Sequence, residues 1–212
     1  MGVVVRLAFG RLWWLLPVRR VAQTAGVLAF EHPAPAWRPH LLLVPKRSIR
    51  SLLAAQAADY QLVGEIVRLG IGLALRRKLD GAGFALLVNG GTYQDVPQLH
   101  FHLAGLDDGL CYCAPVLPTG SPLVHTVIFT AYPHPDPQRA VHAVIRPAQP
   151  LVWRDLAGPP GEEIGRALVS VAQQLVARLE LGAAGFTLLA SVPPGGLDAP
   201  VCFHLVAGER RP

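Results

Sequence analysis

Residues 98–103 read QLHFHL and alternate polar with apolar side chains at every position. Side chains of a β-strand point to opposite faces in turn, so the pattern predicts a strand with Gln98, His100 and His102 on one face. Neutral imidazole is a nucleophile at physiological pH, and a neighbouring imidazolium can donate a hydrogen bond to a phosphate oxygen. Two adjacent histidines therefore favour phosphoryl or nucleotidyl transfer. The alternative is a solvent-facing strand with two incidental histidines.

The same stretch recurs 102 positions later, where residues 203–205 repeat residues 101–103 as Phe-His-Leu. The shift needs no gaps and pairs six of the eight histidines: His32 with His134, His40 with His142, and His102 with His204. A register of this length indicates a tandem duplication. We expect domains at residues 1–116 and 117–212, joined by the Pro- and Gly-rich stretch 114–124.

Each unit is expected to hold short strands and one long helix. The first unit predicts strands ending near Phe30, over residues 40–44, over 84–89 and over 98–103. Between them, residues 56–79 carry apolar side chains at helical spacing, namely Leu62, Ile66, Leu69 and Leu73. Strands combined with one amphipathic helix predict an α+β unit with an antiparallel sheet of about five strands.

Composition limits the function classes without choosing among them. The 212 residues are 51% hydrophobic and 16% charged, which excludes a disordered or low-complexity chain. The net charge is +5, and Glu31 is the single acid among the first 50 residues. A basic segment of this kind suits an anionic small ligand, a nucleic acid or a membrane surface. Nucleic acid is disfavoured because no basic stripe interleaved with aromatic residues appears.

Three cysteines do not form a disulfide framework, and the pattern favours reduced thiols in a cytoplasm without a metal site. The first twenty residues are too short and too charged to span a bilayer, so we expect no membrane partner. A short helix that docks onto the core is the expectation for this segment, with the apolar residues Leu7, Leu12, Trp13 and Leu15. Abundant Arg, Ala, Gly and Pro with two lysines suggest a GC-rich bacterial genome.

Several segments together resemble the histidine triad (HIT) family. They are residues 40–46 (HLLLVPK), the helix, residues 87–91 (LVNGG) and residues 94–102 (QDVPQLHFH). Residues 17–21 and 27–30 fit the same pattern, so the resemblance covers residues 10–106 and, through the repeat, the rest in degenerate form. Single HIT units pair into dimers through their sheets. The resemblance therefore implies an intramolecular pseudo-dimer that is a monomer in solution.

In the HIT family the middle histidine of a His-x-His-x-His strand attacks the α-phosphorus of a nucleotide and forms a nucleotidyl-histidine intermediate. The resemblance places His100 at this nucleophile position and His102 at the outer histidine, which binds phosphate and assists the leaving group. His40 corresponds to the upstream histidine behind the triad, Asn89 to the phosphate-contacting asparagine, and Phe30 to the residue that packs the base. No cofactor and no obligatory metal are implied.

Three departures bear on this assignment. Gln98 replaces the first triad histidine and cannot titrate, which shortens a proton relay. Gln94 and Asp95 belong to the expected substrate-binding set, although Asp95 stands where single-domain members often carry serine near the phosphate. His32 stands at the usual ribose-binding aspartate.

The second unit departs further, since Cys202 takes the nucleophile position, Pro200 that of Gln98 and Ser191 that of Asn89. His142 is expected to be a core histidine, and Cys202 a buried thiol without an adjacent base. The expected function is hydrolysis or transfer of a nucleoside phosphate by the first half. The rival is a non-enzymatic nucleotide-binding or scaffold protein, which Gln98 and Asp95 favour and the His100, His102 and Asn89 set disfavours.

Overall fold

The computed structural model describes residues 18–113 and 120–210. The proposed N-terminal docking helix and the expected domain boundary at 116/117 lie outside these residues. The first half contains strands β1 (Arg20–Gln23), β2 (Val27–Glu31), β3 (His40–Pro45), β4 (Phe84–Gly90) and β5 (Phe101–Gly105), with helix α2 (Tyr60–Arg76). The second half contains β6 (Val124–His125), β7 (Phe129–Pro133), β8 (Arg139–Pro147), β9 (Phe186–Val192) and β10 (Phe203–Arg210), with helix α3 (Pro159–Arg178).

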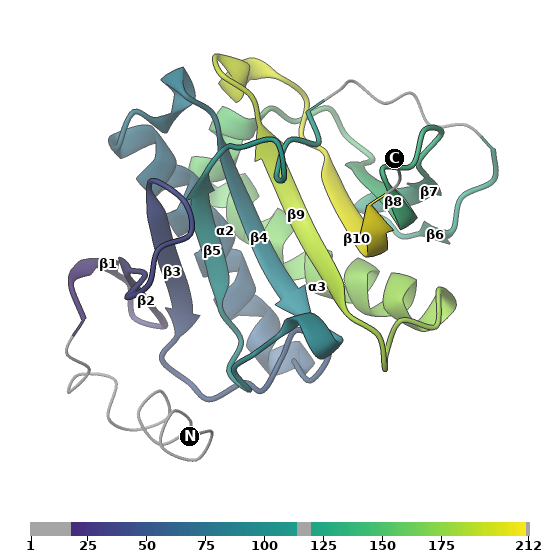
Figure 1. The fold of residues 1–212 in the computed structure, drawn as a ribbon, viewed down its shortest axis with the longest axis horizontal. Coiled ribbons are helices and arrows are strands. Elements are labelled where there is room, and N and C mark those ends of the chain that lie inside the picture. The colour runs from purple at the N-terminus through teal and green to yellow at the C-terminus, as the bar shows by residue number, and fades with distance from the viewer. Residues whose placement is uncertain (1–17, 114–119, 211–212) are drawn as a thin grey trace.

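All ten strands form one antiparallel sheet in the order β1-β2-β3-β5-β4-β9-β10-β8-β7-β6 (Figure 1). The order of the second half mirrors that of the first, with β4 and β9 in the centre. Leu87 of β4 pairs directly with Leu189 of β9, which is its own counterpart in the repeat. The pseudo-two-fold axis therefore passes between these two residues. The α+β fold class and the pseudo-dimer of two similar units are confirmed.

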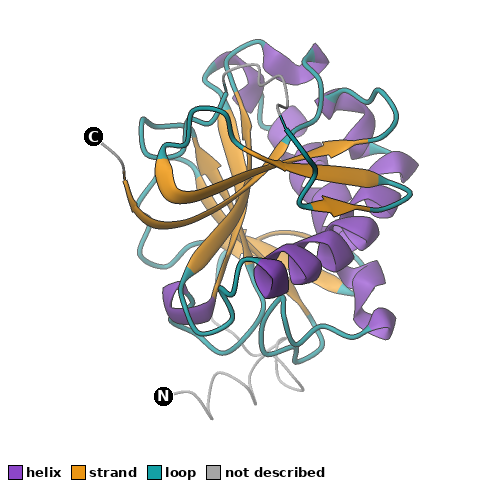
Figure 2. Cartoon of the chain, turned by 90° about the vertical axis from the view of Figure 1, so that its right-hand side faces the viewer, coloured by secondary structure: helices purple, strands orange, loops and turns teal. Residues whose placement is uncertain are grey.

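Helices α2 and α3 both cover one face of the sheet (Figures 1 and 2). They approach closely at Gly64 and Gly165, where a Cβ atom on Gly165 would lie 2.7 Å from the Cα atom of Gly64. The main core lies between helices and sheet and includes Leu99, Phe101 and Leu103. The other face carries no helix among the described residues, and we call it the open face.

Two expected element boundaries are wrong in detail. The helix expected over 56–79 begins at Tyr60 after a 3-10 turn and ends at Arg76, shortly before Lys78 adopts a left-handed conformation (φ 55°). The strand expected over 98–103 begins at Phe101, because the backbone bends at Gln98 before joining the ladder. The alternation of faces nevertheless holds, since the apolar members of this stretch face the helices. No helix in the described part of the chain has the length and apolar character that a membrane span requires.

The arrangement predicts a monomer in solution. The central strands β4 and β9 already pair with each other through seven residue pairs, so the sheet edge that would join two single units is used within the chain. The outer edges are the short strands β1 and β6, and short edges disfavour pairing between chains. Light scattering at micromolar concentration should give the 22.7 kDa mass of one chain. A mass of twice this value would contradict the prediction.

Candidate functional site

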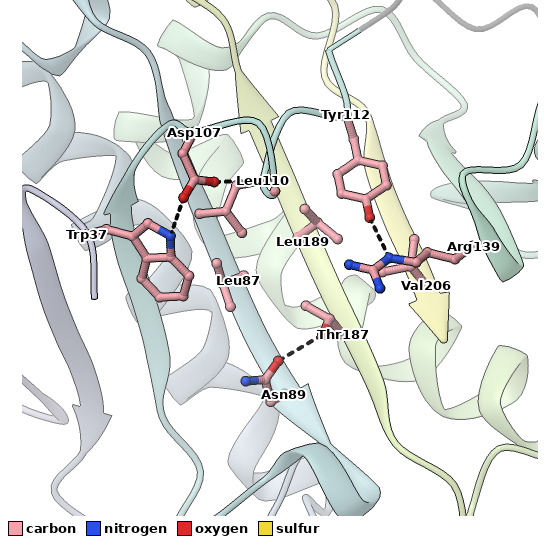
Figure 3. A pocket seen from close by; sticks show the side chains of 11 residues that line it. Trp37, Leu87, Asn89, Asp107, Leu110, Tyr112, Arg139, Thr187, Leu189 and Val206 are labelled. Atoms are coloured by element: carbon pink, nitrogen blue, oxygen red, sulfur yellow. Dashed lines mark hydrogen bonds between the residues drawn. The ribbon is translucent and has the colours of Figure 1, made fainter. Parts of the chain in front are cut away.

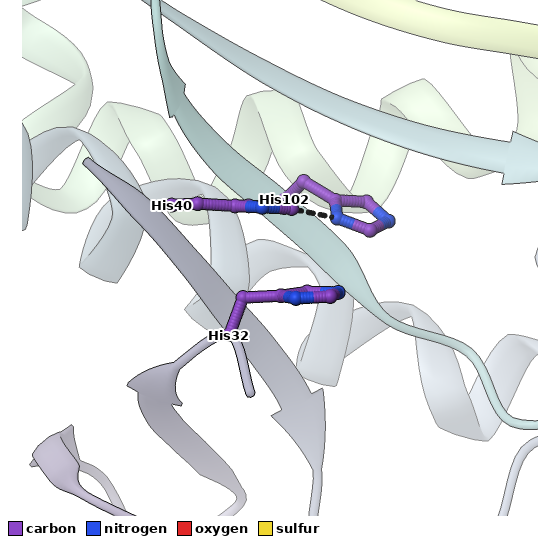
Figure 4. A group of neighbouring side chains, drawn as sticks. All are labelled: His32, His40 and His102. Atoms are coloured by element: carbon purple, nitrogen blue, oxygen red, sulfur yellow. Dashed lines mark hydrogen bonds between the residues drawn. The ribbon is translucent and has the colours of Figure 1, made fainter. Parts of the chain in front are cut away.

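The open face carries two features near the middle of the sheet. One is a pocket over β4 and β9 (Figure 3), and the other is a group of histidines on β3, β5 and the turn after β2 (Figure 4). The histidine group lies within the first half. The pocket lies between the halves.

His32, His40 and His102 form a connected group of rings, which we call the first-half trio (Figure 4). The rings of His32 and His40 stack with centroids 4.0 Å apart. The backbone N–H of Ala36 donates to His40 Nδ1 (3.2 Å), so His40 Nε2 carries the proton and donates to His102 Nδ1 at 2.9 Å. His102 Nδ1 is thus an acceptor, and its proton lies on Nε2.

Two members of the trio, His40 and His102, are kept neutral by burial. Burial, followed by the neighbouring histidines, lowers the pKa of His40 to about 4 and that of His102 to about 3. His102 is therefore a neutral ring that donates through its Nε2–H, and the expectation of an imidazolium beside His100 is wrong. Its Nε2 atom is buried and has no partner among the described residues. Buried donors without partners are rare in native proteins and call for a functional explanation.

His100 has the opposite tautomer to His40 and His102. Its Nδ1 lies 2.7 Å from the carbonyl oxygen of Gln98, which can only accept, so Nδ1 carries the proton and Nε2 carries the lone pair. Burial lowers the pKa of His100, an effect that the Gln98 carbonyl and Asp95 partly oppose. The ring packs edge-on against His102, with centroids 4.9 Å apart. A neutral imidazole with a free Nε2 is the form that attacks phosphorus.

A cavity of about 360 Å³ opens beside His100. Phe30, His32 and Gln98 line it together with aliphatic side chains of β3. Gln98 is 1% exposed, which rules out the solvent-facing alternative for this stretch. Its Nε2 donates to the carbonyl oxygen of Arg47, while its Oε1 has no partner among the described residues. The cavity is therefore lined by an aromatic ring, by Gln98 and by His100.

The other expected substrate-binding residues divide into two groups. Asn89 lies on the open face, and its Oδ1 accepts from the hydroxyl of Thr187 at 2.8 Å, which leaves the amide nitrogen free to donate (Figure 3). Gln94 lines none of the cavities described here. Its Nε2 donates to the carbonyl oxygens of Arg50 and Val96, so it fixes the loop before His100. Asp95 is exposed.

Sequence reasoning missed two residues that organise the site. Trp37 packs edge-on against His40, with centroids 4.7 Å apart, and donates from Nε1 to Asp107 at 2.9 Å. Thr187 comes from the second half and orients Asn89. The position of Trp37, three residues before His40, could have indicated that it belongs to the site. Nothing in the sequence links Thr187 to Asn89.

The second half reproduces the trio with His134, His142 and His204. His142 Nε2 lies 2.9 Å from His204 Nδ1, and His134 stacks on His142 with centroids 4.0 Å apart, as in the first half. Burial likewise lowers the pKa values of His142 and His204 to about 3. This confirms that His142 is a core histidine.

The loop that contains Leu110 and Tyr112 covers the histidines of the second half. Tyr112 packs on His142 and His204, and Ser191, the counterpart of Asn89, donates to the carbonyl oxygen of Leu110 in the same loop. Cys202 was expected to have no adjacent base, yet its Sγ lies 3.6 Å from the imidazole Nε2 of His204. That nitrogen carries a proton, and burial raises the pKa of Cys202 to about 11. Cys202 is therefore a thiol without a base.

Both trios have the composition of a metal site, since ligand atoms of each lie within 4.8 Å of one another. The hydrogen bonds argue against that use. The lone pair of His40 Nδ1 accepts from Ala36, and that of His102 Nδ1 accepts from His40. A metal needs these lone pairs, so binding one would break the chain of hydrogen bonds.

The buried trios predict a fall in stability in mild acid. The pKa values of His40, His102, His142 and His204 lie at about 4, 3, 3 and 3, below the ordinary 6.5. Between pH 6.5 and about 4 the unfolded chain binds more protons than the folded chain, so the free energy of unfolding falls as pH falls. Each histidine contributes a slope of up to about 1.4 kcal/mol per pH unit.

Urea unfolding at pH 7.5, 6.5 and 5.5 measures this slope. The His204→Gln variant should show a shallower slope than the parent chain, whereas the variant His125→Gln, at an exposed position outside both trios, should keep it. A free energy of unfolding that does not change over this range would contradict the lowered pKa values of these four histidines.

Comparison with known proteins gives three findings. A family model described as the HIT domain matches residues 16–109. An uncharacterized HIT-like protein of Synechococcus elongatus is 35% identical over 92 residues, which are 42% of this chain and 80% of that protein. Two solved structures from Arabidopsis thaliana extend the likeness over both halves, and at 9% identity they show the fold alone.

The first is a galt-like protein, with 98% of this chain and 83% of that chain covered at a TM-score of 0.66. The second is an ADP-glucose phosphorylase with bound ADP-glucose, with 94% of this chain and 79% of that chain covered at a TM-score of 0.67. The family model thus matches the first half, while the structural match includes the duplicated unit.

Proposed function

The chain belongs to the HIT family, and on this premise we propose that its first half hydrolyses or transfers a nucleoside phosphate through a nucleotidyl group on His100. The observation that carries the proposal is the hydrogen bond from His100 Nδ1 to the carbonyl oxygen of Gln98. It fixes the tautomer in which Nε2 is the nucleophile. Positioning of this kind removes much of the entropic cost of a bimolecular attack.

The first step forms the bond between His100 Nε2 and the α-phosphorus and breaks the bond from phosphorus to the leaving group, which departs with the electron pair. The ring then carries a positive charge, and the carbonyl oxygen of Gln98 stabilises it through the Nδ1 proton. In the second step water or another acceptor attacks phosphorus. The N–P bond breaks with its electron pair returning to Nε2, the proton of the acceptor passes to the solvent, and His100 returns to the neutral form.

Two donors are available for the phosphate oxygens. The amide nitrogen of Asn89 has no partner among the described residues, and the same holds for His102 Nε2. His102 Nε2 is covered by the surrounding side chains, so a phosphate oxygen reaches it only if a neighbouring ring turns aside. Fixed donors aimed at developing charge supply a large share of catalysis in such sites.

The cavity of about 360 Å³ beside His100 is the proposed place of the nucleoside. Phe30 offers an aromatic surface to the base. The Oε1 atom of Gln98 has no partner among the described residues but is buried, so it accepts a hydrogen bond from a sugar hydroxyl or from the attacking water only if the side chain turns toward the cavity. We assign the active unit to residues 1–116 and the closed unit to residues 117–212.

A panel of substrates tests this function against the rival nucleotide-binding or scaffold protein. The panel contains dinucleoside polyphosphates, nucleotide sugars and nucleoside phosphoramidates, with turnover followed by chromatography of the products and binding followed by calorimetry. The proposal predicts release of a nucleoside monophosphate from at least one class. Tight binding without turnover across the panel would favour the rival.

A further inference from the structure

The pocket at the centre of the open face lies on the pseudo-two-fold axis and has a volume of about 260 Å³ (Figure 3). Its floor contains Leu87 and Leu189, the pair through which the axis passes. In a dimer of identical units, the two walls of such a pocket would be the same residue. In this chain the duplication has allowed them to differ.

The two walls are Trp37 and Arg139, which are counterparts at a shift of 102 positions. Trp37 is held by its hydrogen bond to Asp107 and by its contact with His40. Arg139 reaches over the floor from the side of the second half, and its Nε donates to the hydroxyl of Tyr112 at 3.2 Å (Figure 3). One wall is thus aromatic and the other cationic.

Arg139 is half-buried and has no salt bridge to a carboxylate among the described residues. The acid in the pocket, Asp107, is already engaged, because it accepts from Trp37 Nε1 and from the backbone N–H of Leu110. A guanidinium presents several donors in one plane and binds phosphate oxygens with two of them. The charge of Arg139 is therefore available to an anion in this pocket.

The pocket adjoins the proposed reaction centre. Leu87 of the floor pairs with His102 on β5, and Asn89 stands at one end of the pocket. The cavity of about 360 Å³ that is lined by His100 lies on the side of β5 away from β4, over β2 and β3. A substrate with its α-phosphate over His100 can therefore extend its leaving group across β4 toward the second half.

We propose that this central pocket binds the leaving group of the substrate and that Arg139 selects a leaving group carrying phosphate over a neutral amine. The inference rests on the proposed function and narrows its substrate class to dinucleoside polyphosphates, nucleotide sugars and similar phosphoanhydrides. It also gives the closed second half a role, because Arg139 and Tyr112 form one wall of the pocket.

Two substrates that share one nucleoside test the proposal: a dinucleoside triphosphate, whose leaving group is a nucleoside diphosphate, and a nucleoside phosphoramidate, whose leaving group is an amine. In Arg139→Gln the ratio of kcat/KM for the first to kcat/KM for the second should fall about tenfold to a hundredfold, as expected for a lost charged hydrogen bond. Arg139→Lys should recover part of the ratio. Arg178→Gln removes the same charge from an exposed position on α3 and should keep the ratio.

An unchanged ratio in Arg139→Gln would overturn the proposal while leaving the function of His100 intact. If no substrate turns over, calorimetric titration with inorganic pyrophosphate tests the anion site by itself. The parent chain and Arg178→Gln should then bind pyrophosphate at least about tenfold more tightly than Arg139→Gln. Equal affinities in all three would also overturn the proposal.

Discussion

Replacing His100 by alanine is expected to lower turnover at least about a thousandfold, the scale on which loss of a covalent nucleophile acts. The Gln98 carbonyl oxygen fixes the His100 tautomer whose Nε2 lone pair is free. No other described side chain that lines this cavity has an imidazole held in this way. His100 is half-buried and its ring packs against His102, so the fold of the variant must be measured together with its turnover. Steady-state rates and unfolding curves on the same sample separate loss of chemistry from loss of fold.

The repeat supplies the matched control, since Cys202 occupies the same position in the second half. Its pKa is raised to about 11 by burial, and His204 presents a protonated nitrogen to it, so Cys202→Ala should retain nearly full turnover. Equal losses from the two substitutions would refute the division between an active and a closed half.

Replacing His102 by glutamine is expected to lower turnover about a hundredfold to a thousandfold, similar to removal of one donor to a developing oxyanion. Glutamine keeps an acceptor for His40 Nε2 in its Oε1, but its amide N–H groups do not lie where the ring Nε2–H of His102 points away from His40. If this donor serves the phosphate, kcat should fall more than KM rises.

His204→Gln is the corresponding change in the second half. It replaces the same ring in a trio with the same hydrogen-bond distance, 2.9 Å, so it should change the free energy of unfolding by a similar amount. Its turnover should remain close to that of the parent chain. A comparable loss of turnover in both variants would mean that His102 acts through stability alone.

Much of this architecture could be predicted from the sequence. The pairing of His32, His40 and His102 with counterparts 102 positions later predicted two similar units, and the apolar spacing in residues 56–79 predicted the helix. Both follow from local periodicity and self-similarity, which depend on backbone geometry alone. The alternation in residues 98–103 also separated the helix-facing side chains from the histidines, although the strand begins at Phe101.

Other properties depend on contacts between segments far apart in the chain. The residue types of the trio did not reveal that His102 is a neutral donor, because its tautomer is set by His40 and, through it, by the backbone N–H of Ala36. The sequence also could not predict that Tyr112 would cover the second-half histidines or that Gln94 would hold a loop. These features arise from packing and hydrogen bonding after the sheet has formed.

The most direct test of the account is the covalent intermediate on His100. Gln98 cannot take up the proton that the attacking water gives up, so release of the nucleotidyl group should be slower than its formation, and the intermediate should accumulate. A phosphoramidate is stable in alkali and labile in acid, so the enzyme is mixed with a substrate that turns over and quenched in alkali before mass spectrometry. We expect one added nucleotidyl group on the peptide that contains His100. A nucleotidyl group on any other residue, or turnover that persists in His100→Ala, would contradict it.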